Sequence, residues 1–175
     1  MNLNQNHFEL FGLPARISID TAALEARYHE LQREVHPDRF AAAPDAERRA
    51  SMQWTTRVNE AYRTLKNPVE RARYLLELNG VDVAFETNTA MPADFLGRQL
   101  ELREALELAE AEKDTGALDR LRAALRIETK ELESALGETL DARRDYAAAA
   151  GLVRKLKFLD RFDAEIDSAF ETMDE

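Results

Sequence analysis

The feature that most limits how this chain can fold is a proline held between a histidine and an aspartate, in residues 35–40 (VHPDRF). In a helix interior, Pro37 would remove a backbone hydrogen bond and clash with the preceding turn. It also disfavours helical geometry at His36. Because helical patterns lie on both sides, the stretch is predicted to be a stiff loop between two helices. The loop presents the imidazole of His36 and the carboxylate of Asp38 side by side.

The N-terminal half is predicted to be a helical hairpin closed by this loop. Asp20 and Asp45 are expected to cap the two helices. A short helical segment, 71–78, follows Pro68 and ends near Gly80. Two apolar stripes recur at helical spacing: Leu24, Tyr28, Leu31 and Val35 before the loop, and Trp54, Val58, Ala61, Tyr62 and Leu65 after it. Packed together, these stripes make two antiparallel helices.

The C-terminal half is predicted to be an antiparallel three-helix bundle. Residues 80–91 lose the helical period and are interpreted as a linker between domains at 1–79 and 92–175, and turns are expected at 113–116 and 137–145. The three stripes are Phe95, Leu102, Leu106 and Ala109; then Leu118, Leu121, Leu125, Leu132 and Leu136; then Leu152, Leu156, Leu159, Ile166 and Phe170. The predicted fold class is therefore all-α, a hairpin followed by a bundle.

Composition excludes several classes of function. The chain has no cysteine, which removes disulfides, thiolate zinc sites and iron–sulfur ligation. Residues 1–79 carry 11 Lys/Arg and 11 Asp/Glu, whereas residues 80–175 carry 13 and 23. This acidic half is unsuited to nucleic acid, where basic groups supply most of the affinity. No secretory signal or membrane-spanning run is visible, so a cytoplasmic protein without a cofactor is expected.

Helical geometry sets three apolar residues apart from the bundle stripes. At about 100° per residue from Phe95, Leu96 and Leu100 fall near about 100° and 140°, among glutamates. On the last helix, Phe158 falls about 120° away from Leu152. These residues are candidates for a solvent-facing apolar patch. Two alternatives stay open: scattered surface apolar residues are ordinary, and the three could pack against the N-terminal domain.

Taken alone, His36 and Asp38 allow catalysis, metal binding or contact with a partner. A general acid–base pair needs a pocket that orients it, and a hydrolytic triad needs a nucleophile within reach. Zinc needs further ligands, and only His7 and His29 remain besides carboxylates, at no recognisable spacing. Most chance His-Pro-Asp tripeptides are plain turns.

The order of motifs around the loop resembles the J-domain, a module that stimulates ATP hydrolysis by DnaK-class chaperones. The resemblance narrows to the HscB-type co-chaperone of iron–sulfur cluster assembly, and it spans nearly the whole chain. The motifs that carry it are FELFGLP at 8–14, HPD at 36–38, NEAYRTL at 59–65, NPVERARYLL at 67–76, QLELRE at 99–104 and VRKLKFLD at 153–160.

The resemblance implies a docking surface for a DnaK-class chaperone of the HscA type. Its residues would be His36, Pro37, Asp38, Arg39, Arg27 and Arg33, with the three arginines supplying positive charge on one side. The chain departs from the pattern in two ways. The first hairpin helix also carries glutamates, at 25, 30 and 34, and arginine follows the aspartate where lysine is common.

The resemblance also implies that the bundle binds a cluster scaffold protein of the IscU type. The matching positions are Leu96, Leu100, Glu101, Glu104 and Phe158, whereas Gly97 stands where a larger apolar residue is often found. Such a protein is a monomer that delivers its client and is not itself an enzyme. Two rival interpretations are a J-domain adaptor for a different client and a hydrolase that uses His36 and Asp38.

Overall fold

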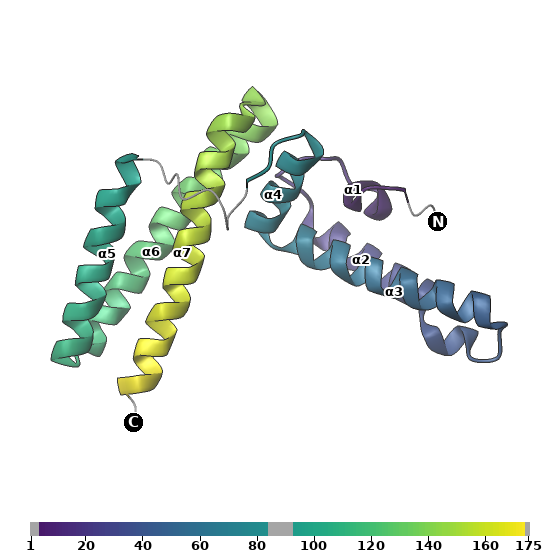
Figure 1. Cartoon of the computed structure of the whole chain (residues 1–175), viewed down its shortest axis with the longest axis horizontal. Helices are drawn as coiled ribbons and strands as arrows, with labels where there is room; N and C mark the ends of the chain where they lie inside the picture. The colour runs from purple at the N-terminus through teal and green to yellow at the C-terminus, as the bar shows by residue number, and fades with distance from the viewer. Residues whose placement is uncertain (1–3, 84–92, 174–175) are drawn as a thin grey trace. The chain divides into compact units, whose positions relative to one another are not determined.

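The computed structural model describes residues 4–83 and 93–173, and every regular element in these ranges is a helix (Figure 1). The predicted all-α class is therefore confirmed. The elements are α1 (His7–Phe11), α2 (Thr21–Val35), the 3₁₀ turn η1 (Pro37–Phe40), α3 (Asp45–Lys66), α4 (Pro68–Leu78), α5 (Ala93–Glu112), α6 (Thr115–Gly137), the π-helical turn η2 (Glu138–Arg143) and α7 (Tyr146–Met173). No helix among them is long and apolar enough to cross a membrane.

The chain divides into two compact units, Met1–Leu75 and Leu76–Glu175. The boundary between them falls inside α4, a few residues before the predicted domain end at 79. The predicted linker, 80–91, lies mostly outside the described residues. The linker therefore stays a prediction.

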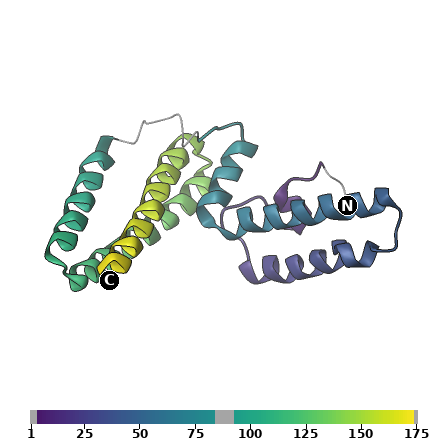
Figure 2. The ribbon, with the colours of Figure 1, turned by 60° about the horizontal axis from the view of Figure 1, so that its bottom comes forward.

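In the N-terminal unit, α2 and α3 run antiparallel and side by side, as Figure 2 shows from a second direction. The rings of Tyr28 and Tyr62 stack with their centroids 3.9 Å apart, and the Tyr28 hydroxyl lies 3.0 Å from Asn59 Oδ1. Trp54, the single tryptophan of the sequence, is half-buried on α3. The hairpin thus has the predicted arrangement.

The two predicted helix caps have different outcomes. The Asp20 carboxylate accepts from the backbone N–H groups of Ala22 and Ala23 at 2.9 and 3.0 Å, as predicted. The prediction for Asp45 was wrong, because Pro44 is the N-cap residue and Asp45 begins the helix. There its carboxylate pairs with Arg48, three residues on.

Helix α4 begins three residues earlier than the predicted segment 71–78. The Asn67 side chain accepts from the N–H groups of Val69 and Glu70 at 2.9 and 3.0 Å. Pro68 occupies the first helical position, where its missing N–H costs nothing. Asn-Pro therefore both ends α3 and starts α4.

The C-terminal unit is the predicted three-helix bundle, visible as α5, α6 and α7 in Figure 1. Arg98 of α5 pairs with Glu128 of α6 at 3.1 Å, and Arg103 of α5 lies 3.9 Å from Glu165 of α7. One cluster of buried residues in its core contains Phe95, Leu102, Leu106, Ala109, Leu118, Leu125, Leu159, Phe162, Ile166 and Ala169.

The predicted turn at 137–145 is shorter in the structure. Gly137 is helical, with φ −58°, and the chain continues as the π-helical turn η2 to Arg143. The helical path ends at Arg144, whose φ of +54° is left-handed. Glycine has a low helix propensity, but the backbone at Gly137 remains helical.

The buried face of α7 winds around the helix. Fully or nearly fully buried residues recur at steps of three from Ala150 to Phe162, by way of Val153, Leu156 and Leu159. Three residues turn a helix by about 300°. Each step of three therefore shifts the buried face by about −60° compared with a face that runs straight along the helix. Hence Leu152, taken as the centre of the stripe from sequence, is only half-buried.

Candidate functional site

The loop between α2 and α3 is held in place by two hydroxyl groups. Ser51 Oγ, on α3, donates to the Val35 carbonyl at 2.6 Å. Thr55 Oγ1 lies 3.1 Å from the same carbonyl and 2.9 Å from the Ser51 carbonyl of its own helix, and these two oxygens share its single proton. The last carbonyls of a helix have no partner within it, so these bonds cap α2 where the loop begins. The sequence interpretation missed both residues. Their four-residue spacing within an apolar helix pattern was the available signal.

The loop itself is stiffened by short-range bonds around Pro37. The Asp38 N–H donates to His36 Nδ1 at 3.2 Å, and the Arg39 N–H donates to the His36 carbonyl at 3.1 Å. In this arrangement His36 Nδ1 acts as an acceptor, so the neutral imidazole carries its proton on Nε2. His36 Nδ1 also lies 3.6 Å from Asp38 Oδ2.

Both side chains point into solvent. The His36 side chain is 56% exposed and the Asp38 side chain 91% exposed. A general acid–base pair works in a pocket that orients it, and a carboxylate this exposed is not in one. The geometry therefore suits contact with a partner better than catalysis.

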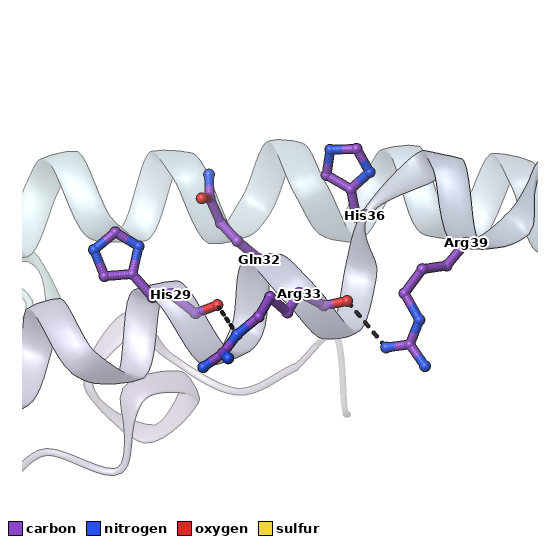
Figure 3. A pocket seen from close by; sticks show the side chains of 5 residues that line it. All are labelled: His29, Gln32, Arg33, His36 and Arg39. Carbon is purple, nitrogen blue, oxygen red and sulfur yellow. Dashed lines mark hydrogen bonds between the residues drawn. The ribbon is translucent and has the colours of Figure 1, made fainter.

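An open hollow of about 560 Å³ lies beside the loop, lined by His29, Gln32, Arg33, His36 and Arg39 (Figure 3). We call it the first hollow. Arg33 Nε donates to the His29 carbonyl at 3.2 Å, and Arg39 Nη1 donates to the Arg33 carbonyl at 3.0 Å. Each guanidinium keeps further N–H groups, so the hollow is suited to an anionic partner group.

Arg27 does not line the first hollow. Its Nη1 lies 3.0 Å from a Glu30 carboxylate oxygen and 3.8 Å from one of Glu34. On α2 it is about 120° around the helix from Arg33. The structure thus brings Arg33 and Arg39 together and leaves Arg27 apart, which corrects the expectation that all three lie on one side.

On α5, the predicted leucines do face solvent. Leu96 is 53% exposed and Leu100 is 59% exposed. Glu101 and Glu104 are exposed beside them, and Glu101 pairs with Arg98 at 3.1 Å. A Cβ atom built on Gly97 meets no atom within 4 Å, so a larger residue would fit there. Gly97 therefore leaves a gap in the apolar face.

Leu108 extends this face and was missed from sequence. It is 59% exposed, and with Leu96, Leu100 and Glu104 it forms a row at steps of four along α5. Residues four apart are neighbours on a helix surface. We call these four residues the α5 row. The i, i+4 spacing would have identified its last member.

Phe158 is less exposed than the prediction of a solvent-facing patch requires, and its place in scaffold binding stays a prediction. It is half-buried against the bundle core. Its ring lies edge-on to Phe95, with centroids 5.6 Å apart, and is stacked near Phe162 at 5.8 Å. The winding of the buried face of α7 brings Phe158 toward the core, since the face centred on Leu152 has turned by that point.

The start of α5 is tied to α7. Lys155 Nζ lies 2.8 Å from Asp94 Oδ2 and 5.4 Å from the centre of the Phe95 ring. The hydrogen bond from Lys155 holds the pKa of the Asp94 carboxyl below its usual value. These contacts fix the helix turn from which the α5 row begins.

No group of three or more His, Asp or Glu side chains that could hold a metal ion occurs within residues 4–83 and 93–173. His36 and Asp38 thus have no third ligand near them in this part of the chain.

Two family models match the chain. The one described as the DnaJ domain matches residues 6–74, and the one described as the HSCB C-terminal oligomerisation domain matches residues 91–167. Together they cover most of the sequence.

Full-length relatives match as well. The chain is 51% identical over 174 residues to a co-chaperone protein HscB homolog of Azoarcus sp. strain BH72, covering 99% of this chain and 98% of that protein. It is 49% identical to a homolog of the same name in Burkholderia multivorans, with 99% of both chains covered.

Solved structures agree in fold. Chaperone HscB from Vibrio cholerae superposes with a TM-score of 0.85 at 36% identity, covering 97% of this chain and 99% of that one. The human co-chaperone protein HscB gives a TM-score of 0.90 at 29% identity, covering 95% and 83%. The Jac1 co-chaperone of Saccharomyces cerevisiae, at 22% identity, shares the fold with a TM-score of 0.75 over 94% and 96%.

Proposed function

The chain belongs to the HscB family of co-chaperones, and from this premise we propose that it serves iron–sulfur cluster assembly. It binds a cluster scaffold protein of the IscU type and delivers it to a DnaK-class chaperone of the HscA type. It also stimulates ATP hydrolysis by that chaperone, which captures the client and favours release of the cluster.

The exposed tip of the hairpin carries the chaperone half of the proposal. Asp38, 91% exposed, offers its carboxylate to a cationic group, and an arginine can meet a carboxylate with two parallel hydrogen bonds. Pro37 and the capping hydroxyls limit the conformations that the loop would lose on binding, which lowers the entropic cost. Arg33 and Arg39 add positive charge beside the tip.

The α5 row supports the scaffold half. Large apolar side chains aligned on an exposed helix face are costly in water and are typical of partner sites. In the described chain, three of the six exposed large hydrophobic residues lie in this row. Glu101 and Glu104 beside the leucines favour a partner surface with basic residues around an apolar centre.

Joining the two sites in one chain is the proposed mechanism. When the bundle holds the scaffold and the loop engages the chaperone, the client meets the chaperone at the effective concentration that the tether sets. In this scheme the protein is a cytoplasmic monomer that is not itself an enzyme and holds no cofactor. Light scattering measures the molar mass of the protein in solution, and a stable oligomer would contradict the proposed monomeric state.

The decisive test separates the two sites. Asp38→Asn should abolish stimulation of the chaperone in single-turnover ATPase assays. Its affinity for the scaffold, measured by calorimetry, should equal that of the wild type. If affinity and stimulation fell together, the division of labour between loop and bundle would be wrong.

Titrating the wild-type protein with the scaffold tests the choice of client. A binding isotherm is expected. Absence of binding together with intact ATPase stimulation would instead indicate an adaptor for a different client. Loss of both would remove the co-chaperone proposal for these two partners.

A further inference from the structure

A second hollow adjoins the hairpin tip. Its volume is about 420 Å³, and its lining comes from Pro37 in the loop and from Asp45, Arg48, Arg49 and Met52 in the first two turns of α3. His36 lines the first hollow and Pro37 lines this one. Two neighbouring residues of the loop therefore line two hollows.

The second hollow combines a free cation with an exposed apolar side chain. Arg48 is engaged, because its Nη2 lies 2.5 Å from Asp45 Oδ1. The Arg49 guanidinium forms no ion pair or hydrogen bond with any described residue. Met52 beside it is 61% exposed. A methionine is flexible enough to fit aliphatic groups of different shape.

Ion pairs on α2 reduce the free positive charge near the loop, so the arginines of the second hollow contribute more of it. Arg27 is paired with Glu30 and Glu34, so it contributes little net positive charge to the surroundings of the loop. Of the arginines that line the two hollows, Arg33 and Arg39 lie in the first and Arg48 and Arg49 in the second. Because Arg48 is paired with Asp45, Arg49 is the arginine of the second hollow that adds free positive charge beside the loop.

We propose that the second hollow is a docking site for an acidic segment of the chaperone that the loop contacts. A carboxylate of that segment pairs with Arg49, and an adjacent aliphatic side chain packs on Met52 and Pro37. The proposal rests on the proposed function. The hollow is assigned to the chaperone because Pro37 belongs both to its lining and to the loop, so a partner that contacts the loop also reaches the hollow.

Two charge reversals on α3 test the site. Arg49→Glu changes the hollow, and Arg63→Glu makes the same change at an exposed position 14 residues further along, about 21 Å away along the helix axis. The concentration that gives half-maximal stimulation of the chaperone ATPase should rise about tenfold for Arg49→Glu. For Arg63→Glu it should stay within about twofold. Circular dichroism checks that both variants are folded.

Two further measurements sharpen the test. The half-maximal concentration of Arg49→Glu should depend less on salt than that of the wild type, because one screened attraction has been removed. Met52→Ala should raise it about threefold through lost apolar contact, without changing the salt dependence. Scaffold affinity should equal that of the wild type in every variant.

The outcomes separate this inference from the proposed function. If the wild type stimulates the chaperone and Arg49→Glu behaves like Arg63→Glu, the second hollow is not a docking site and the proposed function stands. If Arg49→Glu weakens scaffold binding instead, the hollow belongs to the other partner and the assignment is overturned. A wild type without stimulation overturns both proposals.

Discussion

The Val35 carbonyl shows how a single residue of α3 controls the loop. Ser51 is 4% exposed and donates to this carbonyl at 2.6 Å. Ser51→Ala should lower the free energy of unfolding by about 1 kcal/mol, since one buried hydrogen bond is lost while the Thr55 hydroxyl, 3.1 Å away, can turn to the Val35 carbonyl. Urea denaturation measures the change. Thr56→Ala is the control, because its hydroxyl bonds to an exposed carbonyl of its own helix. Equal stability of the two variants would show that the Ser51 bond does not hold the loop.

His7 predicts a pH dependence of stability. Its ring is stacked 4.2 Å from that of Tyr74 and is 8% exposed. Burial lowers the pKa of His7 from its ordinary value of 6.5, the charge of Arg57 lowers it further, and Glu60 opposes the shift. The folded state therefore stays neutral where the unfolded chain already binds a proton.

Stability should consequently fall as the pH drops below about 6.5. His7→Gln removes this proton and should flatten the change in unfolding free energy between about pH 7 and pH 5. Urea melts at several pH values measure the slope. An unchanged slope in the variant would assign the pH dependence to other groups.

Phe158 leads to a third prediction at the residue scale. Because its ring packs against Phe95 and Phe162, Phe158→Ala should destabilise the C-terminal unit by about 1–2 kcal/mol, part of the cost of a fully buried phenylalanine. Leu96→Ala, at a 53% exposed position, should leave the melting temperature nearly unchanged. If Phe158→Ala left the stability unchanged, the Phe158 ring would not be part of the core packing and would instead face solvent.

At the scale of elements, the α5 row makes a matched comparison possible. Leu108→Ala should weaken scaffold binding by about 1 kcal/mol, or about fivefold in Kd. Ile127 on α6 is equally exposed, at 63%, and lies outside the row. Ile127→Ala should leave the Kd unchanged in the same calorimetric titration. If the two substitutions had the same effect, the row would end at Leu100.

Helices and their order could be predicted because their signals are local. The stripes, the Asp20 cap and the turn near Lys113 depend on residues within a few positions of one another. The phase of α7 could not be predicted from one reference residue. Steps of three between Ala150 and Phe162 turn the buried face continuously, and a fixed wheel centred on Leu152 misses this rotation.

The candidate site divides in the same way. The exposure of Leu96 and Leu100 followed from helical periodicity alone. Ser51 lies 16 residues from the carbonyl it caps, and this pairing exists only once α2 and α3 have packed. The separation of Arg27 from Arg33 could have been predicted from helical geometry, because six residues at about 100° each place the two side chains on different faces of α2.

At the scale of the whole molecule, tethering predicts that the two sites must be in one chain. Asp38→Asn is expected to lose the proposed chaperone contact, and Leu96→Ala combined with Leu100→Ala the proposed scaffold contact. A mixture of these variants should not restore the increase in ATPase activity that we expect from scaffold and wild type together. Free diffusion cannot replace the roughly millimolar effective concentration of a short tether.

Steady-state ATPase assays at micromolar protein provide the measurement. Each variant is first assayed alone with the partner that it still binds. Full recovery of activity in the mixture would show that the loop and the bundle act independently of their connection.

The position of Trp54 has an optical consequence. It is the single tryptophan of the sequence, and it is half-buried on α3, the second helix of the hairpin. Fluorescence excited in the absorption band of the indole ring therefore reports the unfolding of the hairpin and does not report that of the bundle. Far-ultraviolet dichroism reports helices in both units. Comparing the two signals during denaturation distinguishes melting of the hairpin from melting of the bundle without any label.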